Sequence, residues 1–184
     1  MKTVKFIALA KMALCFLFLF SCEPSPKKLI YKYDIEDRLD SLGIQLKSSS
    51  VPVANYVHAV QTGNLLFLAG KGPKDLAGNN IVGRLGEDMS LEEGYQATRR
   101  IGIAQLAVLK EQLGDLNRVK RIVKVLGLVK CTDDFTDQSK VMNGFSDLMV
   151  EVFGAQGKHA RAAVGTNALP GGICAEIELI VEFN

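Results

Sequence analysis

The chain has 184 residues, 48% of them hydrophobic, with 22 basic and 20 acidic side chains and a formal net charge of +2. This length suits a single domain, and so small a charge provides no electrostatic footprint for nucleic acid. The two histidines, His58 and His159, are far apart and have no cysteine or histidine at ligand spacing. We therefore expect no metal, no cofactor and no nucleic-acid partner.

The first 22 residues predict export. Three lysines in the first 11 residues precede the apolar run 12–20, and Ser21 and Cys22 follow. This order is typical of a secretory signal peptide, and the apolar run is short for a bilayer span. Residues 19–22 resemble a bacterial lipobox, so we expect removal of residues 1–21 and lipidation of Cys22. An uncleaved anchor, or cleavage without lipid, stays open as an alternative.

This processing predicts an exported lipoprotein of the bacterial cell envelope, either periplasmic or associated with the outer membrane. The lipid would be its only contact with the membrane, and the net charge would fall from +2 to −1 because three lysines leave. Residues 22–33, which begin with the composition of a tether, precede a single domain over residues 34–184.

The first half of this domain predicts a short helix and a hairpin. Residues 33–41 are charged, with apolar side chains four positions apart, so we expect an amphipathic helix that ends near Gly43. Residues 56–61 and 65–69 predict two strands joined by a turn at 62–64. Residues 70–89 are rich in glycine and asparagine and predict a loop.

The second half alternates helices and strands. Ser90 and Glu93 form a capping box before a helix that should end at Gly114. Residues 119–129 predict a buried strand, and residues 137–153 a second amphipathic helix. Two strands end the chain, and the last one alternates apolar residues with acids. We therefore expect an α+β fold, with helices on one face of a mixed sheet.

Arg161 and Glu176 are candidate site residues. Arg161 lies among small apolar residues, where a buried guanidinium needs an anion, and its planar fork suits a carboxylate. Glu176 lies in the next predicted strand, where it could transfer protons. A structural ion pair between the two side chains, or simple solvent exposure, remains the alternative. Cys131 and Cys174 lie in separate strand-like segments, and we expect them to be buried thiols.

The domain resembles the YjgF or Rid (reactive-intermediate deaminase) family, also known as L-PSP endoribonuclease, and in particular its chorismate-mutase-like branch. The resemblance covers nearly all of residues 34–184. It is carried by the segments Gly127-Leu128-Val129, Asp134-Phe135, Val141-Met142-Asn143-Gly144, Phe153-Gly154, Lys158-His159-Ala160-Arg161, Leu169-Pro170 and Glu176-Ile177-Glu178.

The resemblance implies a chorismate-mutase-like subunit and a homotrimer with ligand clefts between adjacent subunits. It implies hydrolysis of 2-imino acids or their enamines to 2-keto acids and ammonia. Arg161 would bind the substrate carboxylate, and Glu176 would position or activate the water. Tyr56, Asn143 and Gly70 match the other residues of the cleft.

The chain departs from the family pattern at three places. Ala163 replaces a cysteine, His58 ends the segment that reads Tyr-Ser-Gln in the family, and Lys71 ends the segment that reads Ser-Gly-Gln. Three functions are therefore carried forward. They are an imino-acid deaminase, a non-catalytic binder of small carboxylates, and an endoribonuclease.

Overall fold

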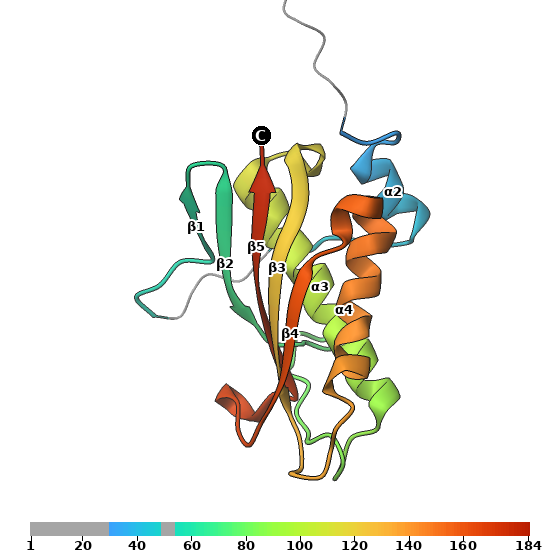
Figure 1. Cartoon of the computed structure of the whole chain (residues 1–184), viewed down its shortest axis with the longest axis vertical. Coiled ribbons are helices and arrows are strands. Elements are labelled where there is room, and N and C mark those ends of the chain that lie inside the picture. Colours follow the sequence, from blue (N-terminus) through green and yellow to red (C-terminus); the bar gives the residue numbers. More distant parts are fainter. Residues whose placement is uncertain (1–29, 49–53) are drawn as a thin grey trace, which may run out of the picture.

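The sheet has five strands with mixed directions. The computed structural model describes residues 30–48 and 54–184, and in this part of the chain the strand order is β1-β2-β5-β3-β4 (Figure 1). β3 and β4 are parallel, whereas the other neighbouring pairs are antiparallel. The strands are β1 (Ala59–Thr62), β2 (Leu65–Lys71), β3 (Val119–Lys130), β4 (Ala160–Thr166) and β5 (Ala175–Phe183).

The helices begin and end at the predicted capping residues. The Ser90 backbone N–H donates to Glu93 Oε2 at 2.8 Å, and the Glu93 N–H donates to Ser90 Oγ, which completes the capping box. Gly114 ends the same helix in the left-handed region, with φ 73°. The α-helices are α2 (Ile35–Ser41), α3 (Leu91–Leu113) and α4 (Gln138–Phe153), and the short 3₁₀ turns are η2 (Leu116–Arg118), η3 (Gly154–Gly157) and η4 (Pro170–Gly172).

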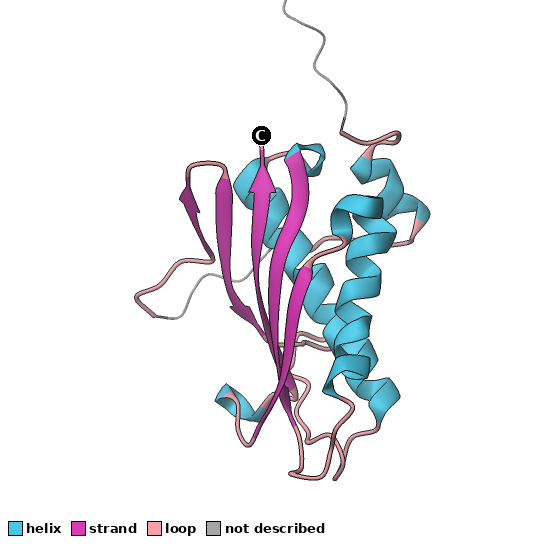
Figure 2. Cartoon of the chain, in the orientation of Figure 1, coloured by secondary structure: helices cyan, strands magenta, loops and turns pink. Residues whose placement is uncertain are grey.

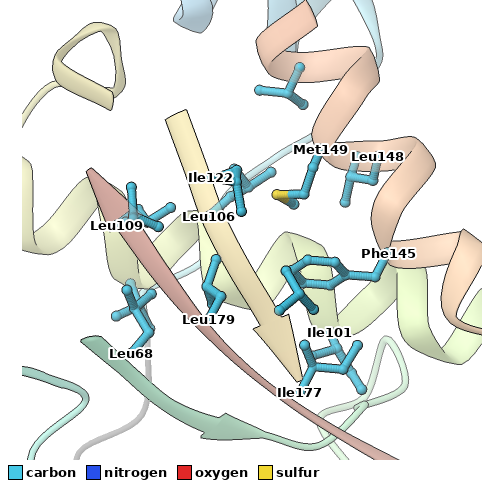
Figure 3. Close-up of a cluster of buried hydrophobic side chains, with 14 of the residues drawn as sticks. Leu68, Ile101, Leu106, Leu109, Ile122, Phe145, Leu148, Met149, Ile177 and Leu179 are labelled. Atoms are coloured by element: carbon cyan, nitrogen blue, oxygen red, sulfur yellow. The ribbon is translucent and has the colours of Figure 1, made fainter. Parts of the chain in front are cut away.

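Both long helices pack on one face of the sheet, and none of the described helices covers the other face (Figure 2). α3 contacts β2 and β5, and α4 contacts β3 and β4. The burial pattern of β5 agrees with this arrangement of one covered and one open face. Ile177 and Leu179 are buried under the helices, while Glu178 between them is exposed. Figure 3 shows Ile177 and Leu179 of β5 and Phe145 of α4 among the buried side chains of this core. The α+β class, the mixed sheet and the two helices on one face are confirmed.

The hairpin differs from its prediction at both ends. β1 begins at Ala59, so Tyr56 precedes the strand in which we expected it, and β2 extends to Lys71. The register of β2 against β5 shifts between Leu68 and Lys71, so that one extra residue lies on β2. Such a bulge bends the strand, and the ladder between β1 and β2 ends at the Ala59–Leu68 pair, next to the bulge.

Both described cysteines are buried and free, as the sequence indicates. Burial raises the pKa of Cys174 to about 11, which keeps it a thiol at neutral pH. The predicted signal peptide, Cys22 and the first part of the predicted tether lie outside the described residues. Within residues 30–48 and 54–184, no helix is long and apolar enough to cross a membrane.

Candidate functional site

Arg161 is held against α4 by three hydrogen bonds. β4 lies at the edge of the sheet beside α4 (Figure 1). The Arg161 Nη1 donates to Asn143 Oδ1 at 3.0 Å and to Ser146 Oγ at 2.9 Å, and Nη2 donates to the Ser139 carbonyl at 3.2 Å. Arg161 and Asn143, which the sequence proposed separately, therefore form one unit. The helix surface fixes the orientation of the guanidinium.

These contacts leave part of the guanidinium available. An arginine has five N–H donors, and the remaining two, one on Nε and one on Nη2, find no acceptor among the described residues. No carboxylate in this part of the chain forms an ion pair with Arg161. The side chain is half-buried and Asn143 is exposed, so an anion from outside can reach it. Two donors on a positive group suit one carboxylate.

Glu176 and Gly70 form a second unit on the open face of the sheet. The Glu176 side chain lies over Gly70, and a Cβ added at Gly70 would overlap its carboxylate. Glu176 is half-buried, whereas its neighbours Ala175 and Ile177 are fully buried under the helices. Gly70 is therefore the residue that lets Glu176 lie flat on this face.

The two units lie on opposite faces of the sheet. The Arg161 side chain reaches α4, while Glu176 alternates with residues that pack under the helices and so points away from them. The register agrees, because Leu128 of β3 pairs with Glu176 on one side and with Val164, not Arg161, on the other. The ion pair that the sequence left open is not formed. One chain alone does not bring Arg161 and Glu176 into one cavity.

Two of the departures from the family pattern contact each other. The Lys71 Nζ lies 3.0 Å from His58 Nδ1, at the edge of the sheet. Partial burial lowers the pKa of Lys71. Tyr56 is exposed and lies edge-on to the His58 ring, with the ring centroids 6.4 Å apart. Tyr56 is thus linked through His58 to Lys71, next to Gly70, whereas Asn143 belongs to the Arg161 unit.

Sequence reasoning missed Ser146 and His159 as members of the arginine unit. Ser146 is three residues after Asn143, so it lies on the same face of α4. His159 is two residues before Arg161, which is the period of a strand. We excluded His159 as a metal ligand and named it in the family segment 158–161, but gave it no role at the site, although both periods could have placed it and Ser146 beside Arg161.

A pocket of about 350 Å³ lies near the carboxyl end of β4 and the N-terminus of α4. None of the predicted site residues lines it, so it is separate from both units. Its lining residues are Cys131, Thr132, Asp133, Phe135, Gln138, Gly165, Thr166 and Asn167.

Comparison with known proteins agrees with this fold. Residues 36–182 match the family described as "YjgF/chorismate mutase-like, putative endoribonuclease", and the chain belongs to this family. It is 42% identical over 147 residues to Protein TCP17 of Trypanosoma cruzi, a match that covers 79% of this chain and 92% of that protein.

Solved structures give the same result. A crystal structure described as a "putative endoribonuclease" from Shewanella oneidensis MR-1 is 30% identical, with a TM-score of 0.78, and the match covers 82% of this chain and all of that one. RidA from the Antarctic bacterium Psychrobacter sp. PAMC 21119 is 26% identical, with a TM-score of 0.52, over 76% of this chain and 98% of that one. The fold is therefore that of the Rid proteins.

Proposed function

We propose that this protein is a homotrimeric Rid-family deaminase, which hydrolyses small 2-imino acids or their enamines to 2-keto acids and ammonia. The observation that supports the proposal is the fixed orientation of the Arg161 guanidinium and its two remaining N–H donors. Three hydrogen bonds to α4 orient its guanidinium, and two donors remain for a carboxylate. A preoriented arginine is suited to recognising the carboxylate that imino and keto acids share.

The trimer supplies what one chain lacks. Arg161 and Glu176 lie on opposite faces, so a cleft that uses both needs Arg161 from one subunit and Glu176 from its neighbour. Apolar side chains on the open face of the sheet are a second reason to expect that a neighbouring subunit covers it. Val60, Phe67 and Ile180 stand side by side across three strands, and Val60 and Phe67 are 57% and 41% exposed. An exposed apolar patch is typical of an interaction site.

In this cleft the reaction needs only a water and a base. Arg161 holds the carboxylate of the substrate in its iminium form. Glu176 takes a proton from a water molecule while the oxygen of that water forms a bond to C2 of the substrate, and the C=N electron pair moves to nitrogen. The protonated Glu176 then gives its proton to the amino group. Ammonia leaves as the C–N bond breaks and the carbonyl forms. The released hydroxyl proton passes through Glu176 to ammonia, giving ammonium and the 2-keto acid.

A carboxylate-binding trimer without turnover is the second candidate. Ala163 offers no polar atom where typical deaminases have a cysteine. The Lys71 and His58 side chains contact each other, so they do not reproduce the two glutamines of the family pattern. These departures leave Arg161 unchanged and alter the reacting part of the cleft. Binding is therefore expected under both candidates, and release of keto acid separates them.

Subunit mixing tests the proposed function and the shared cleft together. The Arg161→Ala and Glu176→Gln trimers should each be inactive towards an enzymatically generated imine. Trimers refolded from an equal mixture should recover activity, because a cleft that joins two different subunits can contain both native residues. Random assembly gives such a cleft about one time in four, so recovery should reach about a quarter of the wild-type rate.

Three other outcomes of this experiment would contradict parts of the proposal. No recovery in mixed trimers would show that Arg161 and Glu176 do not act together in a cleft between two subunits. A wild-type protein that binds pyruvate without releasing keto acid from imine would favour the second candidate. Cleavage of RNA by metal-free protein, with neither of the other activities, would favour the endoribonuclease function. Light scattering on the same samples measures whether the protein is a trimer.

The Gly70→Ala variant should lose turnover and keep its stability. The added methyl group would displace the Glu176 carboxylate, which is the far end of a flexible side chain. The free energy of unfolding should therefore change by no more than about 1 kcal/mol. Misplacing a catalytic group by about 1 Å costs roughly a hundredfold in rate, whereas pyruvate binding at Arg161 should be retained.

Gly72→Ala is the matched control for this prediction. Its added methyl group would meet Ile173 instead of Glu176, so turnover should stay near that of the wild type. Equal losses of turnover in both variants would show that backbone distortion, and not the position of Glu176, causes the effect.

We also propose that the protein acts at the cell envelope, since residues 1–22 have the pattern of a lipoprotein signal. The imino acids would then have to be formed or released in that compartment.

A further inference from the structure

The hydrogen bonds of Arg161 continue to a histidine. Ser146 Oγ, which accepts from Arg161, lies 3.1 Å from His159 Nε2, and His159 Nδ1 lies 2.7 Å from the Gly157 carbonyl oxygen. A carbonyl oxygen only accepts hydrogen bonds, so Nδ1 carries the proton of the neutral ring. Nε2 then accepts from the Ser146 hydroxyl. Arg161, Ser146, His159 and Gly157 therefore form one continuous chain of hydrogen bonds, which runs from the guanidinium to the Gly157 carbonyl.

The surroundings of His159 favour its neutral form. α4 contributes the Ser146 hydroxyl and the edge-on ring of Phe145, 6.2 Å away, and η3 contributes the Gly157 carbonyl. β4 contributes Arg161, the charged side chain that acts on the imidazole. Burial lowers the pKa of His159, the positive charge of Arg161 lowers it further, and the hydrogen bond to Gly157 partly opposes both effects.

Protonation of His159 would change what Ser146 can do. Both ring nitrogens of a charged histidine donate, so the Ser146 oxygen would accept from His159 as well as from Arg161. Its own proton would have to turn away. The direction of the Ser146 hydroxyl proton therefore depends on the protonation state of His159, while the Ser146 oxygen accepts from Arg161 in both states.

We propose that Ser146 and His159 are a positioning pair for Arg161, and that a carboxylate bound at Arg161 favours protonation of His159. The reason is that the negative charge of the ligand compensates the guanidinium charge, which otherwise opposes a second positive charge nearby. The inference rests on the proposed role of Arg161 as the carboxylate anchor. It adds that the site binds carboxylates more tightly in mildly acidic solution.

The sign of this effect follows from linkage. Binding raises the pKa of His159, so the complex holds more protons than the free protein over the pH range between the two pKa values. Affinity therefore increases as the pH falls through that range, which begins below the ordinary histidine value of about 6.5. A pKa rise of about half a unit corresponds to roughly threefold tighter binding below this range than above it.

The test is an NMR titration of the histidine ring protons in the full-length protein, with pyruvate as the probe. The chain has two histidines, and the His58→Asn variant assigns their signals. In the free protein His159 should titrate below about 6.5. Saturating pyruvate should raise the pKa of His159. Arg161→Gln should also raise the pKa of His159 without any ligand, because it removes the charge that opposes protonation.

The variants at the pair itself separate positioning from folding. His159→Asn keeps a donor for the Gly157 carbonyl and cannot reach Ser146, so pyruvate binding should lose its pH dependence below about pH 6.5. Ser146→Ala should weaken pyruvate binding several-fold, and Ser146→Thr, which keeps the hydroxyl, should restore it. If His159→Asn does not fold, the titrations of the wild type and of Arg161→Gln still decide the question.

The outcomes distinguish this inference from the proposed function. If pyruvate binds and the His159 pKa moves neither with pyruvate nor in Arg161→Gln, the coupling is wrong and the carboxylate site stands. If Arg161→Gln raises the pKa of His159 but pyruvate does not bind, the coupling within the protein stands and the proposed substrate class is wrong. A rise in the pKa of His159 both on pyruvate binding and in the Arg161→Gln variant supports the inference.

Discussion

The Arg161→Ala variant should bind pyruvate at least tenfold more weakly than the wild type. The substitution removes the two donors that remain for a ligand carboxylate, and each charge-assisted hydrogen bond contributes roughly 1.5–3 kcal/mol. Arg161→Lys should also bind poorly, because an ammonium cannot reproduce the planar fork or the contacts with Asn143 and Ser146. Titration calorimetry with pyruvate measures both effects.

Two further variants make this prediction specific. Arg121→Ala removes an exposed arginine of β3 and should leave pyruvate affinity unchanged, which controls for the loss of one positive charge. Glu176→Gln should bind pyruvate nearly as well as the wild type and lose turnover, since it removes the base and keeps the shape. Wild-type affinity in Arg161→Ala would mean that the carboxylate binds elsewhere.

The Gly144→Ala variant should be strongly destabilised, although alanine is the better helix former by about 1 kcal/mol. Gly144 lies in the middle of α4, where this helix crosses α3. A Cβ there would overlap the Tyr95 backbone carbonyl and come within 2.6 Å of Thr98 Oγ1. Backbone atoms cannot move aside without separating the helices, so we expect a loss of about 3 kcal/mol or more in the free energy of unfolding.

Gly102→Ala is the matched comparison, because it lies in α3 at the same helix interface. Its added methyl group would come within 2.6 Å of Leu148 Cδ2, a side-chain atom that can rotate away. Chemical denaturation should therefore show a clearly smaller loss than for Gly144→Ala. Equal losses would mean that side-chain repacking, and not the backbone contact at Tyr95, limits this interface.

Local signals predicted most of the fold. The capping box at Ser90, the left-handed Gly114 and the alternation in β5 each depend on a few neighbouring residues, and the structure reproduces all three. The strand that we expected to begin at Tyr56 begins at Ala59. Its length depends on the bulge in β2, which is a property of the pairing and leaves no clear local pattern.

The site was predicted only in part, for a related reason. The arginine, the glutamate and the glycine were all proposed from residue types and from the family resemblance. Which of them meet could not be read from spacing, because the position of β4 beside α4 depends on the parallel pairing of β4 with β3, which is not a local property of the sequence. The hydrogen bond between Ser146 and His159 also depends on where β4 lies, so His159, to which we gave no role at the site from the sequence, belongs to the arginine unit.

Periodicity and capping signals were sufficient to predict the class of fold and the order of its elements, because both are local properties of the sequence. That Arg161 faces α4 while Glu176 lies on the open face above Gly70 became visible only in the folded chain. The physical reason is the alternation of side chains in a strand, which places a residue on one face or the other according to its pairing register. Register is set by contacts between segments that are distant in the sequence.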